Sequence, residues 1–374
     1  MERIAVVGLG AMGLGIAQVY AQAGFSVTAT DTQPAARDSA KKRLRAVLEP
    51  RVAAGKLAQT AMDVTLENLI VVNGLAHIGP ADLIVEAVIE DLSIKQALLQ
   101  QLELNADTTT VLATNTSALS VGALAQGLSR PERLLGLHFF NPAPVMNLVE
   151  LVMHPTTSAA AAACARNLTE RAGKTVITCA DRPGFIVNRC ARPFYGEALA
   201  LMEEGRTASD IDAAMLAAGY RMGPFSLIDL IGADINLAAT EGLARGMDHL
   251  PRYHVFSALR DQVAKGDLGR KSGRGFLFPA SPGAPPADAG AIRLRIEAML
   301  ANEAASLLAE GSTPAADIDA ALKLGLNFPR GPFESARLLG REAIITELAR
   351  LRAAAPPGLA DRYQLQPVLL TALQ

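Results

Sequence analysis

The chain has 374 residues, of which half are apolar and 19% are charged, and its formal net charge is −2. At roughly 150 residues per domain, this length predicts two or three domains with sizeable cores, and the composition argues against extended disorder. The nearly balanced charge argues against binding to nucleic acid or a membrane surface, because both require a concentrated basic face.

The three cysteines, Cys164, Cys179 and Cys190, form no CxxC pattern and no Cys/His cluster. We therefore expect reduced structural thiols and no metal site. The first apolar strand starts almost at the initiator Met, and no apolar run is long enough to cross a bilayer. These features predict a cytoplasmic protein.

The first predicted elements are a strand, a glycine motif, a helix and a second strand. The apolar run 4–7 precedes the sequence GLGAMG at residues 8–13, a helical pattern continues to Gly24, and the second strand covers residues 25–29. This is the context that a G-x-G-x-x-G dinucleotide motif requires. The helix N-terminus would then face a diphosphate. The predicted cofactor-binding residues of this motif are Gly8, Gly10, Ala11, Met12 and Gly13.

Each glycine of the motif has a separate task. Gly8 permits the tight turn, Gly10 lets the backbone approach the pyrophosphate, and Gly13 lets the helix pack closely on the strand. Asp31 follows the second strand, where a carboxylate accepts hydrogen bonds from the adenosine ribose and repels a 2′-phosphate. Residues 32–34 contain no arginine that could bind such a phosphate. The sequence therefore predicts NAD as the cofactor.

Further strands are predicted at residues 69–72, 83–87, 111–113 and 134–137, with helical stretches between them. This alternation indicates an α/β Rossmann-type, doubly wound and mostly parallel sheet. Ligands of such sheets bind beyond the carboxyl ends of the strands. The polar sequences at those ends are EAVIE at 86–90, TNTS at 114–117 and HFFNP at 138–142.

His138 is the predicted general base, because imidazole titrates near neutral pH and this histidine ends a strand. Glu150 follows at the end of the apolar run 145–149. If the chain reverses at Pro142 and Pro144, the carboxylate reaches the imidazole, fixes its tautomer and stabilises the imidazolium.

Several longer strings resemble the 3-hydroxyacyl-CoA dehydrogenase family. They are HFFNPAPVMNLVE at 138–150, NTS at 115–117, PGFIVNR at 183–189, GPF at 223–225 and GRKSG at 269–273. Their mutual spacings also match, and the likeness covers residues 1 to about 278. The resemblance implies NAD-dependent oxidation of (S)-3-hydroxyacyl-CoA to 3-oxoacyl-CoA.

The resemblance also implies roles for single residues. His138 would take the hydroxyl proton and Glu150 would orient it, while Ser117 and Asn188 would hydrogen-bond the reacting oxygen region of the substrate. The residues implied to contact NAD are Glu90, Lys95, Ser117, Asn141 and Lys271. Taken alone, Lys95 would be an ordinary solvated helix residue.

A basic stretch at residues 37–56 resembles the arm of this family that meets the CoA phosphates, and RVAAGKL at 51–57 matches members with short substrates. We expect Lys56 to contact CoA, because lysine and arginine suit a phosphate-bearing ligand, although a charged helix is commonly only a solvated face. Members of the family often have lysine where this chain has Asn147, which leaves the substrate preference open.

After about residue 183 the strands stop, and amphipathic helices are predicted at 192–204 and 208–216. Residues 279–290 are rich in proline, alanine and glycine and predict a linker. The expected division is an NAD-binding domain at 1–182, a helical domain at 183–278, the linker at 279–290 and a second helical copy at 291–374.

The segment after the linker repeats the one before it. EALALM at 197–202 returns as EAASLL at 303–308, and GPF at 223–225 returns as 331–333; DIDAA at 210–214 also returns, at 317–321. The offsets of 106 to 108 residues indicate a duplicated helical domain. In shorter family members this domain pairs with a second subunit, so we expect either an internal pseudo-dimer or a homo-oligomer. The second copy lacks a PGFIVN sequence and is expected to scaffold.

Family members with a similar duplicated helical domain include bacterial 3-hydroxybutyryl-CoA and 3-hydroxyadipyl-CoA dehydrogenases of fatty-acid β-oxidation and phenylacetate breakdown. The sequence NRCARPFY at 188–195 resembles that group. A dicarboxylic acyl group requires a cation near its far end, for which Arg189 and Arg192 are candidates. Two alternatives remain open. One is a dehydrogenase of free 3-hydroxyacids, whose catalytic lysine Lys174 matches poorly, and the other is a non-catalytic nucleotide-binding relative.

Overall fold

The computed structural model describes residues 2–373 and contains two compact units, the first ending at Arg182 and the second beginning at Pro183. Each unit is described by itself. Within the described residues, every helix is too short or too polar to serve as a bilayer-spanning segment.

The first unit is built on an eight-stranded sheet with the strand order β3-β2-β1-β4-β5-β6-β7-β8. Strands β1 to β6 pair in parallel, β7 runs antiparallel to β6, and β8 is parallel to β7. The strands are β1 (Arg3–Val7), β2 (Ser26–Thr30), β3 (Leu69–Val71), β4 (Leu83–Glu86), β5 (Val111–Thr114), β6 (Leu134–Phe139), β7 (Leu148–Met153) and β8 (Thr175–Ala180). The predicted doubly wound, mostly parallel sheet is confirmed, and β7 and β8 are strands in addition to the predicted ones.

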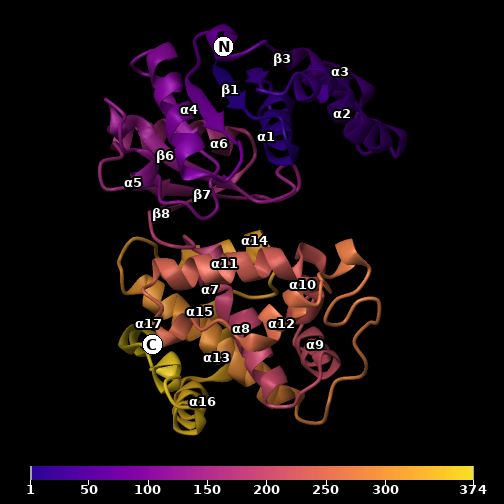
Figure 1. Cartoon of the computed structure of the whole chain (residues 1–374), viewed down its shortest axis with the longest axis vertical. Coiled ribbons are helices and arrows are strands. Elements are labelled where there is room, and N and C mark those ends of the chain that lie inside the picture. Colours follow the sequence, from indigo (N-terminus) through magenta and orange to yellow (C-terminus); the bar gives the residue numbers. More distant parts are fainter. Residues whose placement is uncertain (1, 374) are drawn as a thin grey trace. The chain divides into compact units, whose positions relative to one another are not determined.

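Helices accompany this sheet, and α1, α2 and α3 gather beside β1 and β3 (Figure 1). The elements are α1 (Ala11–Gln22), α2 (Pro34–Ala53), α3 (Gln59–Asn68), α4 (Leu92–Asn105), α5 (Val121–Leu124) and α6 (Ala159–Arg171), with short 3₁₀ turns at η1 (Leu75–His77) and η2 (Pro131–Arg133). Central strands such as β4 are buried along their whole length, as expected where both faces of a parallel sheet are covered.

The pairing register brings the carboxyl ends of the central strands together. Val7 of β1 lies opposite Glu86 of β4, and Glu86 lies opposite Thr114 of β5. Because these strands are parallel, the loops that follow them emerge at one edge of the sheet. That edge is where an open α/β sheet binds its ligand.

The second unit is helical, and no named strand occurs between residues 183 and 373. Its helices are α7 (Val187–Cys190), α8 (Arg192–Glu203), α9 (Ala208–Ala217), α10 (Pro224–Ile231), α11 (Ala233–Gly246), α12 (Ser257–Ala264), α13 (Ala289–Leu308), α14 (Ala315–Leu326), α15 (Pro332–Leu339), α16 (Arg341–Ala354) and α17 (Pro367–Ala372), with 3₁₀ turns at η3 (Pro251–Tyr253), η4 (Arg270–Ser272) and η5 (Ala360–Tyr363). The predicted succession of a Rossmann-type domain and helical repeats is confirmed.

The two helical copies pack on each other. Helix α13 of the second copy contacts α8 and α9 of the first, as well as α15 and α16 of its own copy, and α14 contacts α7 (Figure 1). The second copy therefore covers a face of the first copy within one chain.

The repeated sequences DIDAA and GPF have a common structural reason. Asp212 accepts hydrogen bonds from the backbone N–H of Phe225 and Ser226, at the start of α10. Asp319 does the same for Phe333, at the start of α15. Each aspartate thus satisfies N–H groups that the first turn of a helix leaves without partners.

The glycine of each GPF sequence is required by these aspartates. A Cβ on Gly223 would lie 2.3 Å from the carboxyl carbon of Asp212. One on Gly331 would lie 2.2 Å from Cβ of Asp319. Both contacts are closer than any real Cβ contact, so each capping aspartate requires a glycine at this position.

The linker expected at residues 279–290 extends slightly too far at its C-terminal end. Helix α13 already begins at Ala289, so residues 289–290 are helical. The proline-rich composition ends at Pro286, whose carbonyl accepts a hydrogen bond from the Ala289 N–H. A helix can start there because no later proline removes a backbone donor.

Candidate active site

A buried histidine–carboxylate pair lies at the end of β6. The antiparallel register places His138 opposite Glu150 on β7, and Nδ1 of the imidazole lies 2.7 Å from Oε2 of the carboxylate. Both side chains are buried, and the Phe140 ring packs on the imidazole at 4.6 Å between centroids. An ionised carboxylate only accepts hydrogen bonds, so Nδ1 carries the hydrogen and Nε2 is the nitrogen that can accept a proton.

The reversal between these two strands is held by a buried lysine. Lys174 Nζ donates to the carbonyl oxygens of Ala143 and Met146, at 2.6 and 2.8 Å. Burial lowers the pKa of Lys174. Asn141 and Asn147 are exposed on this turn. The hydrogen bonds of Lys174 explain its presence structurally, so nothing here favours the alternative in which it is a catalytic lysine.

A second buried ionic group lies at the end of β4. Lys95 Nζ is 2.6 Å from Glu86 Oε1, and both side chains are almost completely buried. Glu86 also accepts hydrogen bonds from Thr114 Oγ1 at 2.7 Å and from the Val88 N–H at 2.8 Å. Lys95 is therefore not the solvated helix residue that its sequence neighbourhood suggests when taken alone.

Glu86 was not selected from the sequence, although a signal was present. It is a charged residue that ends a wholly apolar strand of a buried sheet, where an unpaired carboxylate would be very costly. The cation nine residues further on, Lys95, satisfies it. The sequence signal is thus the charged strand end itself, and the structure identifies Lys95 as its partner.

Glu90 organises the loop that follows β5. It accepts hydrogen bonds from Thr116 Oγ1 at 2.6 Å and from the backbone N–H groups of Ser117 and Ala118 at 2.9 and 3.2 Å. Partial burial alone would raise the pKa of Glu90, but the Thr116 hydrogen bond, the nearby Lys95 ammonium and the backbone donors outweigh it and lower the pKa. Ser117 is exposed on the loop that Glu90 holds.

The loop after β5 is joined directly to the end of β6. Asn115 Oδ1 accepts a hydrogen bond from the Phe139 N–H at 2.8 Å. Because Ser117 lies two residues after Asn115 and His138 directly precedes Phe139, this bond holds the loop with Ser117 against the strand end with His138.

The glycine motif has the geometry of a dinucleotide-binding turn. Gly8 adopts a φ of 99°, and a Cβ on Gly13 would lie 1.8 Å from the Gly8 carbonyl oxygen, so neither position tolerates a side chain. No described protein atom lies within 4 Å of where a Cβ on Gly10 would stand. Gly10 is thus not required by packing within the protein, which fits a role in close approach of a ligand. Ala11 and Met12 form the first turn of α1 behind it.

Asp31 stands at the carboxyl end of β2, next to this turn. Its Oδ2 accepts a hydrogen bond from the Leu9 N–H at 2.7 Å, and Oδ1 accepts one from Gln33 N–H at 2.8 Å. Arg37 Nη1 donates to the carbonyl oxygens of Asp31 and Thr32. The glycine turn, the free end of α1 and this carboxylate together fit the diphosphate and ribose of a dinucleotide.

The basic stretch divides into structural and exposed residues. Like Arg37, Arg43 is used within the protein, since its Nη2 donates to the Leu9 carbonyl oxygen at 2.7 Å. Lys56 is exposed in the turn that follows α2, and its N–H donates to the Arg51 carbonyl oxygen. The other exposed basic residues of the stretch are Lys41, Lys42, Arg45 and Arg51.

Four predicted residues, Asn188, Arg189, Arg192 and Lys271, belong to the helical unit. Asn188 lies in α7, and its carbonyl oxygen accepts a hydrogen bond from Arg192 Nε at 2.9 Å. Lys271 lies in η4 with its ammonium 2.6 Å from Asp234 Oδ2. Arg189 is committed to the second copy, because it pairs with Glu303 and so is not available for a substrate carboxylate.

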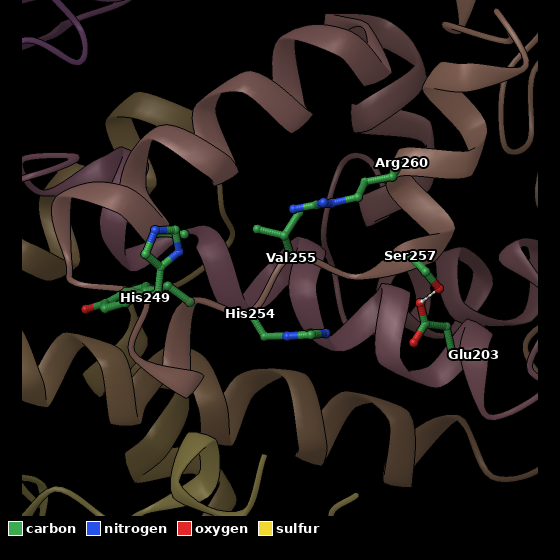
Figure 2. A pocket seen from close by; sticks show the side chains of 8 residues that line it. Glu203, His249, His254, Val255, Ser257 and Arg260 are labelled. Carbon is green, nitrogen blue, oxygen red and sulfur yellow. Dashed lines mark hydrogen bonds between the residues drawn. The ribbon is translucent and has the colours of Figure 1, made fainter. Parts of the chain in front are cut away.

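The helical unit also contains a cavity of about 470 Å³. Its wall includes His249, His254, Tyr253 and Glu203, and Glu203 accepts a hydrogen bond from Ser257 Oγ at 2.7 Å (Figure 2). None of the residues selected from the sequence lines this cavity. It is therefore not the predicted active site.

Fold and site define an NAD-binding dehydrogenase domain followed by helical repeats. The model of the 3-hydroxyacyl-CoA dehydrogenase NAD-binding domain matches residues 3–182, and the model of the C-terminal domain of the same family matches 184–278 and again 290–371. The chain belongs to the 3-hydroxyacyl-CoA dehydrogenase family. It is an NAD-dependent enzyme of that family.

Individual relatives agree with this assignment. The chain is 42% identical to a 3-hydroxyadipyl-CoA dehydrogenase of Escherichia coli K12, over 74% of this chain and 58% of that relative. It is 38% identical to a 3-hydroxybutyryl-CoA dehydrogenase of Mycobacterium tuberculosis, over 74% and 98%. A crystal structure of 3-hydroxybutyryl-CoA dehydrogenase from E. coli K12 covers 100% of this chain and 98% of its own, with 32% identity and a TM-score of 0.92. The chain thus spans less than two thirds of the first of these relatives and nearly all of the other two.

Proposed function

We propose that the chain oxidises (S)-3-hydroxyacyl-CoA to 3-oxoacyl-CoA with NAD, with His138 as the general base and Glu150 as the group that orients it. The observation that carries this proposal is the buried contact of 2.7 Å between the two side chains at the carboxyl end of β6. A histidine whose tautomer is fixed by a carboxylate is the arrangement that proton transfer from a hydroxyl requires.

The chemistry follows from these residues. Nε2 of His138 takes the proton of the 3-hydroxyl while the bond from C3 to oxygen becomes a carbonyl. NAD, when bound, accepts the hydride that leaves C3. The imidazolium formed in this step is stabilised by the Glu150 carboxylate in a site of low polarity. Ser117 and Asn188 are proposed to hydrogen-bond the reacting oxygen, which becomes more polar as the carbonyl forms.

The proposed cofactor contacts are the glycine turn, Asp31, Glu90, Lys95, Asn141 and Lys271, and Lys56 is the proposed CoA contact. For Lys95 the buried pairing with Glu86 and Glu90 supports a role in holding those carboxylates close to the cofactor edge of the sheet. The exposed position of Lys56 supports an electrostatic contact with a phosphate.

The acyl group is proposed to be short or dicarboxylic, as in the substrates after which the relatives are named. Arg192 is the remaining candidate cation for a distal carboxylate, because it forms no ion pair within residues 2–373. Its guanidinium donates to Thr240 Oγ1 and to the Asn188 carbonyl oxygen and lies over the Tyr195 ring. An Arg192→Gln variant is expected to lose kcat/KM for 3-hydroxyadipyl-CoA more than for 3-hydroxybutyryl-CoA. Equal losses for both thioesters would contradict this role.

The direct test of the general base is His138→Gln. Turnover should fall by about 10²- to 10⁴-fold, the usual contribution of a general base, while the Kd for NAD stays within a few-fold of the parent value. Unimpaired turnover would remove His138 from the mechanism.

His154→Gln is the matched control. His154 is also a buried histidine of the first unit, but its ring bonds to the carbonyl oxygens of Pro131 and Leu134 and to Thr156 Oγ1. This variant should lose stability and keep its kcat. A similar loss of kcat in both variants would mean that the His138 effect is structural.

We also propose that the enzyme is cytoplasmic and works as a monomer with an internal pseudo-dimer. The absence of a CxxC pattern among its three cysteines suits a reducing compartment. The packing of α13 on α8 and α9 supports the second part, which sedimentation of the intact chain tests directly.

A further inference from the structure

Buried ion pairs are exchanged between the two helical copies. Arg189 of the first copy donates from Nε to Glu303 Oε1 at 2.8 Å and from Nη1 to Glu310 Oε1 at 2.7 Å, and both acceptors belong to the second copy. Its Nη2 reaches Ser306 Oγ at 3.2 Å. Only 2% of the Arg189 side chain is exposed, so its charge depends on these partners.

The reciprocal contacts are also present. Arg295 of the second copy donates from Nε to Glu197 Oε2 at 2.8 Å and from Nη1 to Glu204 Oε2 at 2.6 Å, and both acceptors belong to the first copy. Arg189 and Arg295 are 106 residues apart, as are Glu197 and Glu303, and Glu204 and Glu310. The interface is therefore built like that of a two-fold dimer, in which each side supplies the same donor and the same acceptors.

The supporting residues obey the same symmetry. Tyr253 donates its phenol hydrogen to Glu303 at 2.7 Å, and Tyr363 lies 3.4 Å from Glu197 in the corresponding place. Arg362 pairs with Glu197 at 2.8 Å. Both halves of the interface are thus fully built, and neither can be regarded as a remnant.

The two halves differ in the residue that precedes each arginine. Asn188 precedes Arg189, whereas Leu294 precedes Arg295. The duplication has therefore kept the ion pairs on both sides and the proposed substrate-binding asparagine on one side only.

The segment that carries Asn188 requires support. Gly184 has a φ of 74° and Phe185 has a φ of 47°, which is unusual for a bulky side chain. Such a backbone persists only where surrounding contacts determine it. The Arg189 N–H donates to the Gly184 carbonyl oxygen at 3.0 Å, and the Arg189 guanidinium is anchored on α13 and Glu310. Arg189 therefore links the turn to the second copy by hydrogen bonds, in addition to the packing of α7 on α13 and α14.

We infer that Arg189 is a positioning residue for Asn188, and that the second helical copy serves the reaction by holding the segment 184–190 through Glu303 and Glu310. The inference rests on the function proposed for Asn188. It gives the second copy a role in substrate binding although that copy lacks the PGFIVN sequence.

The test compares Arg189→Lys with Arg295→Lys. Lysine keeps the positive charge but lacks the planar guanidinium that donates to two glutamates at once. Both arginines are buried to a similar degree. Both variants should lose similar thermal stability. Arg189→Lys should in addition lose about tenfold in kcat/KM for the acyl-CoA thioester, with the KM for NAD unchanged, whereas Arg295→Lys should stay within twofold of the parent.

Glu310→Gln and Glu204→Gln form a second pair at the outer acceptors, of which Glu310 is 25% and Glu204 is 57% exposed, for use if the buried substitutions prevent folding. The expected contrast is the same, and Glu310→Asp should restore part of the lost kcat/KM. Equal kcat/KM in the two members of a folded pair would overturn the inference, because the ion pairs would then be purely structural.

A double-mutant cycle with Asn188→Ala separates this inference from the function on which it rests. If Arg189 acts through Asn188, then Glu310→Gln should cost little further kcat/KM in the Asn188→Ala background. Full additivity of the two losses would overturn the positioning role and leave the function of Asn188 intact. Parent-like kinetics of Asn188→Ala alone would overturn the assignment of Asn188 and the inference together.

Discussion

Replacing Glu150 by glutamine removes one charge from the His138 pair with little change of shape. Glu150 is fully buried, and its Oε2 lies 2.7 Å from Nδ1 of the imidazole. A hydrogen bond to a charged group contributes about 1.5–3 kcal/mol, which corresponds to roughly 10- to 150-fold in rate when it is made to the imidazolium that forms in the transition state. If the amide nitrogen of glutamine turns toward Nδ1, it donates and stabilises the tautomer whose Nε2 cannot accept a proton, so the loss becomes larger.

The assay is NADH formation with a 3-hydroxyacyl-CoA thioester, followed together with the Kd for NAD and the thermal unfolding of the variant. We expect kcat to fall by at least tenfold, the Kd for NAD to stay within a few-fold, and the protein to remain folded. A folded Glu150→Gln enzyme with kcat within twofold of the parent would refute the reasoning, because the carboxylate would then contribute nothing to proton transfer.

Four further variants test the cofactor turn, Asp31 and the capping aspartate of α15. Gly13→Ala should destabilise the protein by about 1–3 kcal/mol, because the new methyl group meets the Gly8 carbonyl oxygen at 1.8 Å. Gly10→Ala should keep the parent melting temperature and weaken NAD binding at least tenfold. Calorimetry and NAD titration distinguish these two effects. Asp31→Asn keeps an acceptor for the Leu9 N–H but removes the charge, so the preference for NAD over NADP in kcat/KM should fall roughly tenfold or more. Burial raises the pKa of Asp319 from 3.8 to about 6, so the folded state holds its proton longer than the unfolded state does, and this contribution to stability is lost as pH rises from about 4 to 6. Asp319→Asn should remove that loss, which is on the order of 2–3 kcal/mol, in denaturant unfolding at pH 4 and pH 7; an unchanged pH dependence would contradict the assignment.

The first unit could be predicted well where its signals are local. The glycine motif, its flanking strands and Asp31 follow one another within about thirty residues, and each has a known geometric task. The pairing of His138 with Glu150 was accessible for the same reason, since a proline turn and an apolar run between them indicate a reversal.

Other features depend on contacts that no local pattern reports. Strand β8 joins the sheet edge only because β7 provides a parallel partner. Glu86 reads as part of an apolar strand until the structure shows that the Lys95 ammonium is buried beside it. The sequence alone does not show that the Glu86 and Lys95 side chains are buried together.

Arg189 is the clearest case of a residue whose role lies in a distant partner. Its neighbour Asn188 and its own charge suggest a substrate contact, but Glu303 and Glu310 lie more than a hundred residues further along the chain. Matching sequences reveal the internal repeat, whereas only the three-dimensional structure shows that ion pairs are exchanged between its two copies. Tertiary pairing of this kind explains why the contacts of residues in the helical unit were harder to predict than those in the first unit.

The proposed reaction itself is tested by measuring NADH formation with (S)-3-hydroxybutyryl-CoA, 3-hydroxyadipyl-CoA and a longer 3-hydroxyacyl-CoA, beside free 3-hydroxybutyrate. We expect turnover with the thioesters alone, and the ranking among them defines the acyl preference. Turnover of the free acid alone, or NAD binding without turnover of any thioester, would contradict the proposed function.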